Sequence, residues 1–154
     1  MIKLLMLISL LCVSCASKAL IVKEVISADT IVLNDGTKVR YAGVVAPKAN
    51  DAWFAASKAA NEFLILNHKV SIVKEPKLST DKVVTAYVYT PIGDKGTTKQ
   101  LFVNAELLKF GYAKCPENDN GVENKALWKN LKKMETEAQQ YSVGVWSNQP
   151  PQVP

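Results

Sequence analysis

The side chains that could take part in chemistry are few, and they do not form a familiar metal site. The sequence holds one histidine, His68, and three cysteines, of which only Cys115 lies far from the N-terminus. These two residues are not spaced like zinc ligands, and a lone cysteine is more often a small buried hydrophobe than a nucleophile. Basic side chains are more numerous. The 19 Lys and Arg outnumber the 14 Asp and Glu, and the net charge of +5 favours acidic partners such as nucleic acid.

The first residues have the layout of an export signal. Lys3 precedes the apolar run Leu4–Val13, and small residues follow at 14–17. This run of 10 residues is too short to span a bilayer, which needs about 20. We therefore predict a signal peptide at residues 1–16 and an exported protein.

The end of this leader allows two kinds of cleavage. Val13-Ser14-Cys15 resembles the end of a bacterial lipoprotein signal, in which the cysteine is acylated and becomes the new N-terminus. Cys12 stands where such signals usually have leucine. Cleavage after Ala16 is the alternative. We favour a lipid anchor at Cys15 and a place in the cell envelope, with secretion as the alternative. After either cleavage, Cys115 has no cysteine available for a disulfide bond within the mature chain.

Short β-rich runs predict a small barrel. Asn34-Asp35-Gly36 is a strong hairpin turn between two such runs. The predicted strands are Leu20–Ile26, Asp29–Leu33, Thr37–Val45, Lys69–Lys74 and Val83–Thr90, with Lys99–Val103 pairing back. Five main strands with a helix between the third and fourth predict an α+β fold, a five-stranded OB-type Greek-key β-barrel with about three helices.

The predicted helices have apolar faces for packing on the barrel. The first spans 52–67 and would pack through Ala56, Ala59, Ala60, Phe63 and Leu64. A short helix at 105–110 would be capped by Asn104. The last spans about 123–141, with the stripe Leu127, Leu131, Met134, Ala138 and Tyr141. We predict one domain at residues 20–147 and a flexible, proline-rich tail at 148–154.

Several segments, in order and at nearly the expected spacing, resemble the staphylococcal nuclease (thermonuclease) family. They are Val25–Thr30, Val39–Pro47, Ala86–Tyr89, Val103–Leu108 with Gly111–Ala113, and Gly144–Ser147. The resemblance covers about residues 20–147. It implies the barrel described above and calcium-dependent hydrolysis of phosphodiesters in DNA and RNA. In that chemistry, carboxylates hold calcium, another carboxylate handles the water, and two arginines steady the charge on phosphorus.

The resemblance carries over to some of the family's functional positions. Asp29, in Ser27-Ala28-Asp29-Thr30, keeps the first calcium carboxylate, and Arg40 keeps the first catalytic arginine. Val45 stands in place of the second calcium carboxylate, and Lys48 in place of the carboxylate that handles water. The second arginine is missing from the shortened segment before Ala86.

These replacements predict weak calcium binding, because calcium needs several oxygen ligands and Lys48 would repel the ion. Asp51 could replace one carboxylate only if the chain folded back. Asp29 and Arg40 also have structural alternatives, the capping of a turn and an ion pair. Lys48 and Lys82, with Lys74 and Lys77, could form a phosphate-binding patch or a solvated face.

We therefore predict a monomeric, non-catalytic or strongly impaired domain with no bound calcium, a pseudoenzyme that binds single-stranded nucleic acid or another polyanion. The alternatives are an active metal-dependent nuclease, supported by Asp29 and Arg40, and a structural envelope module that makes protein contacts. A large exposed apolar patch would favour the last of these.

Overall fold

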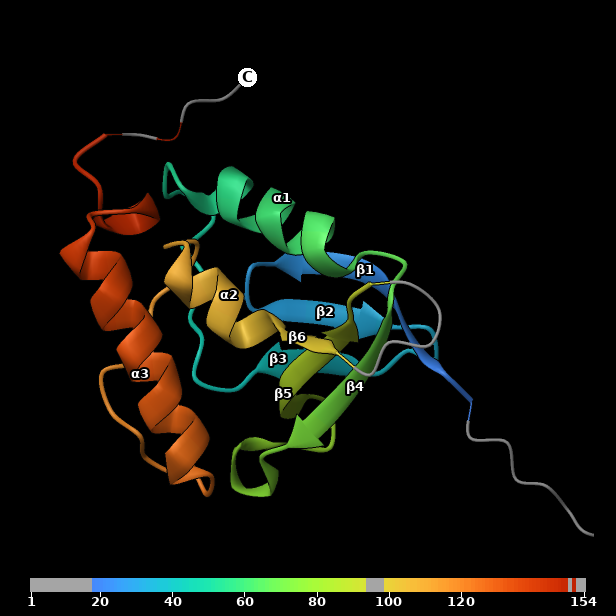
Figure 1. The fold of residues 1–154 in the computed structure, drawn as a ribbon. Helices are drawn as coiled ribbons and strands as arrows, with labels where there is room; N and C mark the ends of the chain where they lie inside the picture. Colours follow the sequence, from blue (N-terminus) through green and yellow to red (C-terminus); the bar gives the residue numbers. More distant parts are fainter. Residues whose placement is uncertain (1–17, 94–98, 150, 152–154) are drawn as a thin grey trace, which may run out of the picture.

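A computed structural model of the protein describes residues 18–93, 99–149 and 151. The predicted leader at 1–16, and with it Cys12 and Cys15, lies outside the described residues. So does most of the predicted tail. Figure 1 shows the described chain as a β-barrel with helices packed on one side of it and at one end.

Five strands close into a barrel of mixed direction. β1 (Leu20–Ser27), β2 (Thr30–Leu33) and β3 (Lys38–Tyr41) form an antiparallel meander. β4 (Lys69–Lys74) pairs antiparallel with β1 and with β5 (Val84–Pro91). A parallel pairing of β3 with β5 closes the barrel, and β6 (Gln100–Phe102) adds to β5. This is the predicted OB-type α+β fold.

The barrel interior is filled by inward-pointing strand side chains, and register shifts in β1 put its two buried valines three positions apart rather than two. Val22 and Val25 of β1, Ile31 and Leu33 of β2, and Val39 of β3 are all buried. The interior also holds two buried tyrosines. Burial raises the pKa of Tyr41, whose hydroxyl donates to Asn61 Oδ1 at 3.0 Å.

The third strand is shorter than predicted. It ends at Tyr41 rather than Val45, and the next residue, Ala42, is only 1% exposed. The reason is a turn just after the strand. Ala42 N donates to Ala86 O at 2.8 Å, and Gly43 then adopts a φ of +69° that residues other than glycine rarely reach. Val45 leaves the barrel and pairs with Lys114 instead.

Helix α1 (Phe54–Ile65) lies across the barrel with a face that only partly matches the predicted one, since Ala60 and Leu64 pack against the core. Its buried residues are Ser57, Asn61 and Ile65, whereas Phe63 is 87% exposed and Ala59 is also exposed. Asn61 is buried because it donates to Ser27 O at 2.9 Å and accepts from Tyr41. A polar residue with distant partners thus fixes the rotation of an alanine-rich helix whose apolar signal is weak.

Helices α2 (Val103–Lys109) and α3 (Lys125–Gln140) pack against each other, and two 3₁₀ turns, η1 (Pro76–Leu78) and η2 (Gly144–Trp146), complete the fold. The predicted stripe of α3 is largely confirmed, because Leu131 and Ala138 are buried. Tyr141 is an exception at 72% exposed. No helix in the described part of the chain is long and apolar enough to cross a membrane.

Asn104 does not cap α2, as we had predicted. It lies within the helix, fully buried, and holds the closed barrel together from the inside. Its Oδ1 accepts from Val88 N at 2.9 Å, and its Nδ2 donates to Ala42 O at 2.9 Å. These bonds satisfy backbone groups that would otherwise be buried without a partner.

The C-terminal turn is fixed by two glycines. The backbone of Gly144 lies so close to that of Gly111 that a Cβ on either residue would collide with the other segment. Val145 N donates to Gly111 O at 2.8 Å, and the Trp146 ring lies under Lys114 Nζ, 4.6 Å from the ring centroid. The segment after α3 is thereby attached to the end of α2.

Candidate functional site

Three of the positions singled out in the sequence come together in one open hollow at an end of the barrel. Asp29, Arg40 and Val45 all contribute to its wall, and its volume is about 440 Å³. Asp29 lies in the tight turn between β1 and β2, and Arg40 lies beside it on β3, opposite Thr30 in the strand pairing. The remaining lining residues are Tyr41, Ala42, Gly43, Val44, Leu78, Thr85 and Pro116.

The Asp29 carboxylate is largely used by the protein itself. Its Oδ1 accepts from Ser27 Oγ at 2.6 Å and from Thr30 Oγ1 at 2.9 Å. Its Oδ2 accepts from Ala46 N at 3.0 Å. The carboxylate therefore ties the β1–β2 turn to the segment that follows β3, which is the turn-capping role that we had considered as a structural alternative.

The Arg40 side chain, unlike the Asp29 carboxylate, is not bonded to other described parts of the protein. It is exposed, and it has no ion pair or side-chain hydrogen bond within the described residues. The alternative of an ion pair with Asp29 is therefore not realised. A guanidinium with all its donors available can receive phosphate oxygens in a bidentate manner.

The rest of the hollow offers few ligands for calcium. Val45 is 45% exposed and presents only methyl groups. Lys48 and Lys82 are exposed on the loops before α1 and β5, and neither lines the hollow. Among the described residues, no group of three or more His, Cys, Asp or Glu side chains could hold a metal ion. The residues around Asp29 therefore do not fit a calcium ion, since one carboxylate that already accepts three hydrogen bonds is the only acid in the wall.

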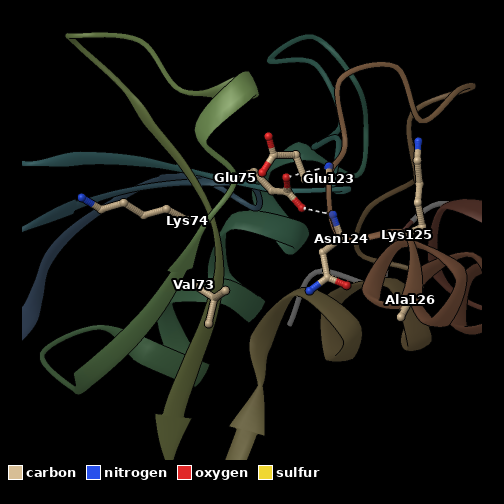
Figure 2. Close-up of a pocket in the computed structure, with 7 residues that line it drawn as sticks. All are labelled: Val73, Lys74, Glu75, Glu123, Asn124, Lys125 and Ala126. Atoms are coloured by element: carbon tan, nitrogen blue, oxygen red, sulfur yellow. Dashed lines mark hydrogen bonds between the residues drawn. The ribbon is translucent and has the colours of Figure 1, made fainter.

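A second hollow lies between β4 and the start of α3, and no sequence pattern predicted it. Its volume is about 510 Å³, and Figure 2 shows its lining residues. At its base is Glu75, which we had assigned to a polar loop and which is only 1% exposed. Lys74 and Lys125 extend away from this carboxylate (Figure 2).

Glu75 is fully engaged in holding α3 against the barrel. Its Oε1 accepts from Tyr87 OH at 2.8 Å and from Asn124 N at 3.0 Å, and its Oε2 accepts from Glu123 N at 2.9 Å. Burial alone would raise the pKa of Glu75, but these three hydrogen bonds outweigh burial and lower it. Glu75 is a buried anchor for the segment leading into α3, and no local sequence pattern marks such a role.

The lone cysteine and histidine do not extend either hollow. Burial, together with the nearby Glu135 carboxylate, raises the pKa of the Cys115 thiol to about 12, so the thiol is protonated at neutral pH. His68 is exposed just before β4, and its Nδ1 lies 2.9 Å from Leu64 O. Cys115 is the small buried hydrophobe that we expected.

A closed OB-type barrel with an open hollow at one end, lined by one acid and one arginine, is a small domain of a type that often binds oligonucleotides. The family model for staphylococcal nuclease homologues matches residues 38–148, and the chain belongs to this family. It is a family of nucleases and nucleic-acid-binding domains, in general calcium-dependent. A search of curated proteins found no match to the chain.

Proposed function

We propose that this protein is an exported, envelope-anchored domain that binds single-stranded nucleic acid and does not hydrolyse it. The observation that carries the proposal is the state of Arg40. It is an exposed guanidinium without a partner in the described structure, and it lies in a hollow whose single carboxylate is already bonded. Such a hollow can attract a phosphate group but lacks ligands for the metal that cleavage needs.

Binding is tested by fluorescence anisotropy with a short labelled single-stranded oligonucleotide and the mature protein. We expect Arg40→Ala to weaken binding about tenfold and to lower the salt dependence by about one phosphate contact. Lys129→Ala, which removes an exposed charge on α3 outside the lining of the hollow, is the matched control and should change affinity little. Equal effects of both variants would show that binding depends on net charge alone and would contradict a site at Arg40.

Absence of catalysis is tested by plasmid digestion with and without calcium. We expect no calcium-dependent cleavage by the wild type. The double variant Val45→Asp, Lys48→Glu should cleave single-stranded DNA slowly. Val45→Asp places a ligand oxygen in the hollow wall, and Lys48→Glu replaces an exposed positive charge on the loop that follows the wall with a carboxylate. Each change alone should do little, because residues that act as a unit are not additive. The missing second arginine would keep the rate about 100- to 1000-fold low.

The rival function is an active nuclease, and the presence of Asp29 and Arg40 in one hollow favours it. Calcium-dependent cleavage by the wild type that is lost in Arg40→Ala would establish it and overturn our proposal. Failure to bind either nucleic acid or calcium would instead favour a role in protein contacts.

Export and anchoring rest on the leader, and they need a separate measurement. We expect mass spectrometry of the native protein to find an N-terminus at Cys15 carrying acyl chains. A start just after Ala16 would indicate a secreted protein. An intact Met1 in the processed pool would contradict export altogether.

A further inference from the structure

The folded domain begins almost immediately after the cysteine proposed to carry the lipid. Only Ala16 and Ser17 separate Cys15 from Lys18, the first described residue. The residue after Lys18, Ala19, is already bonded to the barrel, because Asn34 Nδ2 donates to Ala19 O at 3.1 Å. Four residues of extended chain span at most about 14 Å, so an acylated Cys15 would hold this part of the domain against the bilayer.

The part of the barrel nearest the anchor is defined by hydrogen bonds around the start of β1. We call it the anchor pole, and it comprises residues 18–21, 34–37, 67–69, 90–92 and 99–100. Asn34 N donates to Ile21 O at 2.8 Å, Val22 N donates to His68 O at 3.0 Å, and Thr90 Oγ1 donates to Lys69 O at 3.1 Å. Three connections of the barrel therefore meet at the point where the chain enters.

The hollow with Asp29 and Arg40 lies at the other end of the barrel. β1 runs for eight residues from Leu20 to Ser27, which is about 25 Å along a strand, and Asp29 follows in the next turn. Near Asp29, the Gly43 backbone packs against Leu131 of α3. Figure 1 agrees with this arrangement, since the chain enters β1 on the side of the barrel away from α3.

The anchor pole carries a positive charge. Its described residues include three lysines, Lys18, Lys69 and Lys99, all exposed, and one acid, Asp35, which leaves a net charge of +2. Lys18 lies next to the turn at 34–37, because Asn34 Nδ2 donates to the carbonyl oxygen of the following residue, Ala19, at 3.1 Å. Basic residues held at a bilayer surface attract anionic lipid headgroups.

From these observations we infer that the anchor pole is a membrane-contact surface, on which Lys18 and Lys69 bind anionic phospholipid headgroups while the Arg40 hollow faces away from the bilayer. The inference rests on the proposed anchoring at Cys15. It gives the anchored domain one orientation, in which a nucleic acid strand can reach Arg40 without approaching the negatively charged membrane.

The orientation is tested by tethering the mature chain through the Cys15 thiol to a maleimide lipid in nanodiscs. The nanodiscs contain phosphatidylcholine alone or with phosphatidylglycerol, together with a lipid whose headgroup chelates gadolinium. In the anionic nanodiscs we expect paramagnetic broadening of the amide signals of Asp35–Thr37 and His68–Lys69, and little broadening at Val44–Ala46. Equal broadening at the anchor pole and at Val44–Ala46, or the strongest broadening at Val44–Ala46, would overturn the inference.

The contribution of the lysines is tested with paired variants of equal charge. Lys18→Gln with Lys69→Gln should lower the ratio of docked to undocked protein about 25-fold, at about fivefold for each lysine. Lys129→Gln with Lys133→Gln on α3 should change it less than about twofold, because these residues are far from the bilayer. The proposed headgroup binding would be overturned if the docked fraction were the same on neutral as on anionic nanodiscs. It would also be overturned if the Lys18, Lys69 double variant docked as well as the wild type, because the tether alone would then explain docking. Because the tether is chemical, such a failure leaves acylation and binding at Arg40 to be judged by their own experiments.

Discussion

The hollow at Asp29 and the hollow at Glu75 each contain a carboxylate that accepts three hydrogen bonds, yet the two regions differ in what remains available. At Glu75 the carboxylate is fully buried, and all three donors belong to Tyr87 and the segment that starts α3. At Asp29 the carboxylate is half-buried, and an exposed arginine without a partner in the described structure lies in the same wall.

The comparison teaches that neither the size of a hollow nor the presence of a carboxylate in it identifies a binding site. The two hollows are similar in size, at about 510 Å³ for the one at Glu75 and about 440 Å³ for the one at Asp29. Glu75 nevertheless serves the fold alone, because every bond it makes holds α3 against β4 and β5. What distinguishes the hollow at Asp29 is the unused charge of Arg40, which has more to gain from an external phosphate than from any neighbour in the structure.

The largest effect should come from removing the buried acid. We expect Glu75→Ala to lower the free energy of unfolding by about 3 kcal/mol, because it leaves the Tyr87 hydroxyl and two backbone N–H groups buried without an acceptor. Urea denaturation measures the change. Glu123→Ala is the matched control, since it removes an exposed carboxylate from the same hollow but keeps the backbone N–H, and it should cost less than about 1 kcal/mol. Equal losses in the two variants would contradict the anchoring role of Glu75.

At the other hollow, the acid should matter for stability and the arginine should not. We expect Asp29→Ala to lower the free energy of unfolding by about 1–2 kcal/mol, because Ala46 N and two hydroxyls lose their acceptor. Arg40→Ala should change it by less than about 0.5 kcal/mol, because the side chain is exposed and unpaired in the described structure. Destabilisation by Arg40→Ala as large as that by Asp29→Ala would mean that Arg40 has a structural role.

The smallest effect should be seen in the pH dependence of stability. The pKa of Glu75 is lowered from its ordinary value of 4.5, so the ionised carboxylate stabilises the fold fully above that pH. Its contribution is lost as the pH falls through the lowered value, because the folded state must then take up a proton that it disfavours. The difference in unfolding free energy between the wild type and Glu75→Gln should therefore be constant near neutral pH and shrink only below about 4.5. A difference that shrinks already near neutral pH would show that another group is responsible.

Much of the fold could be predicted from local patterns. The β-branched run of β1, the alternation in β4, the turn at Asn34–Gly36 and the stripe of α3 depend on local residue preferences and on the period of a strand or helix, which act without reference to distant residues. The family resemblance also selected Asp29, Arg40 and Val45 as the positions that matter, and the fold brings these three together in one hollow.

The sequence by itself therefore determined the architecture and the candidate residues, and only the tertiary structure decided which polar groups are used. Asn61 sets the rotation of α1, Asn104 closes the barrel from within and Glu75 anchors α3, each through partners more than ten positions away in the chain. The same holds for the site, where Asp29 accepts a hydrogen bond from Ala46 N while Arg40, beside it, has no partner among the residues that the structure describes. A buried polar group is stable only when a donor or acceptor reaches it, and that depends on how distant segments meet rather than on any local period.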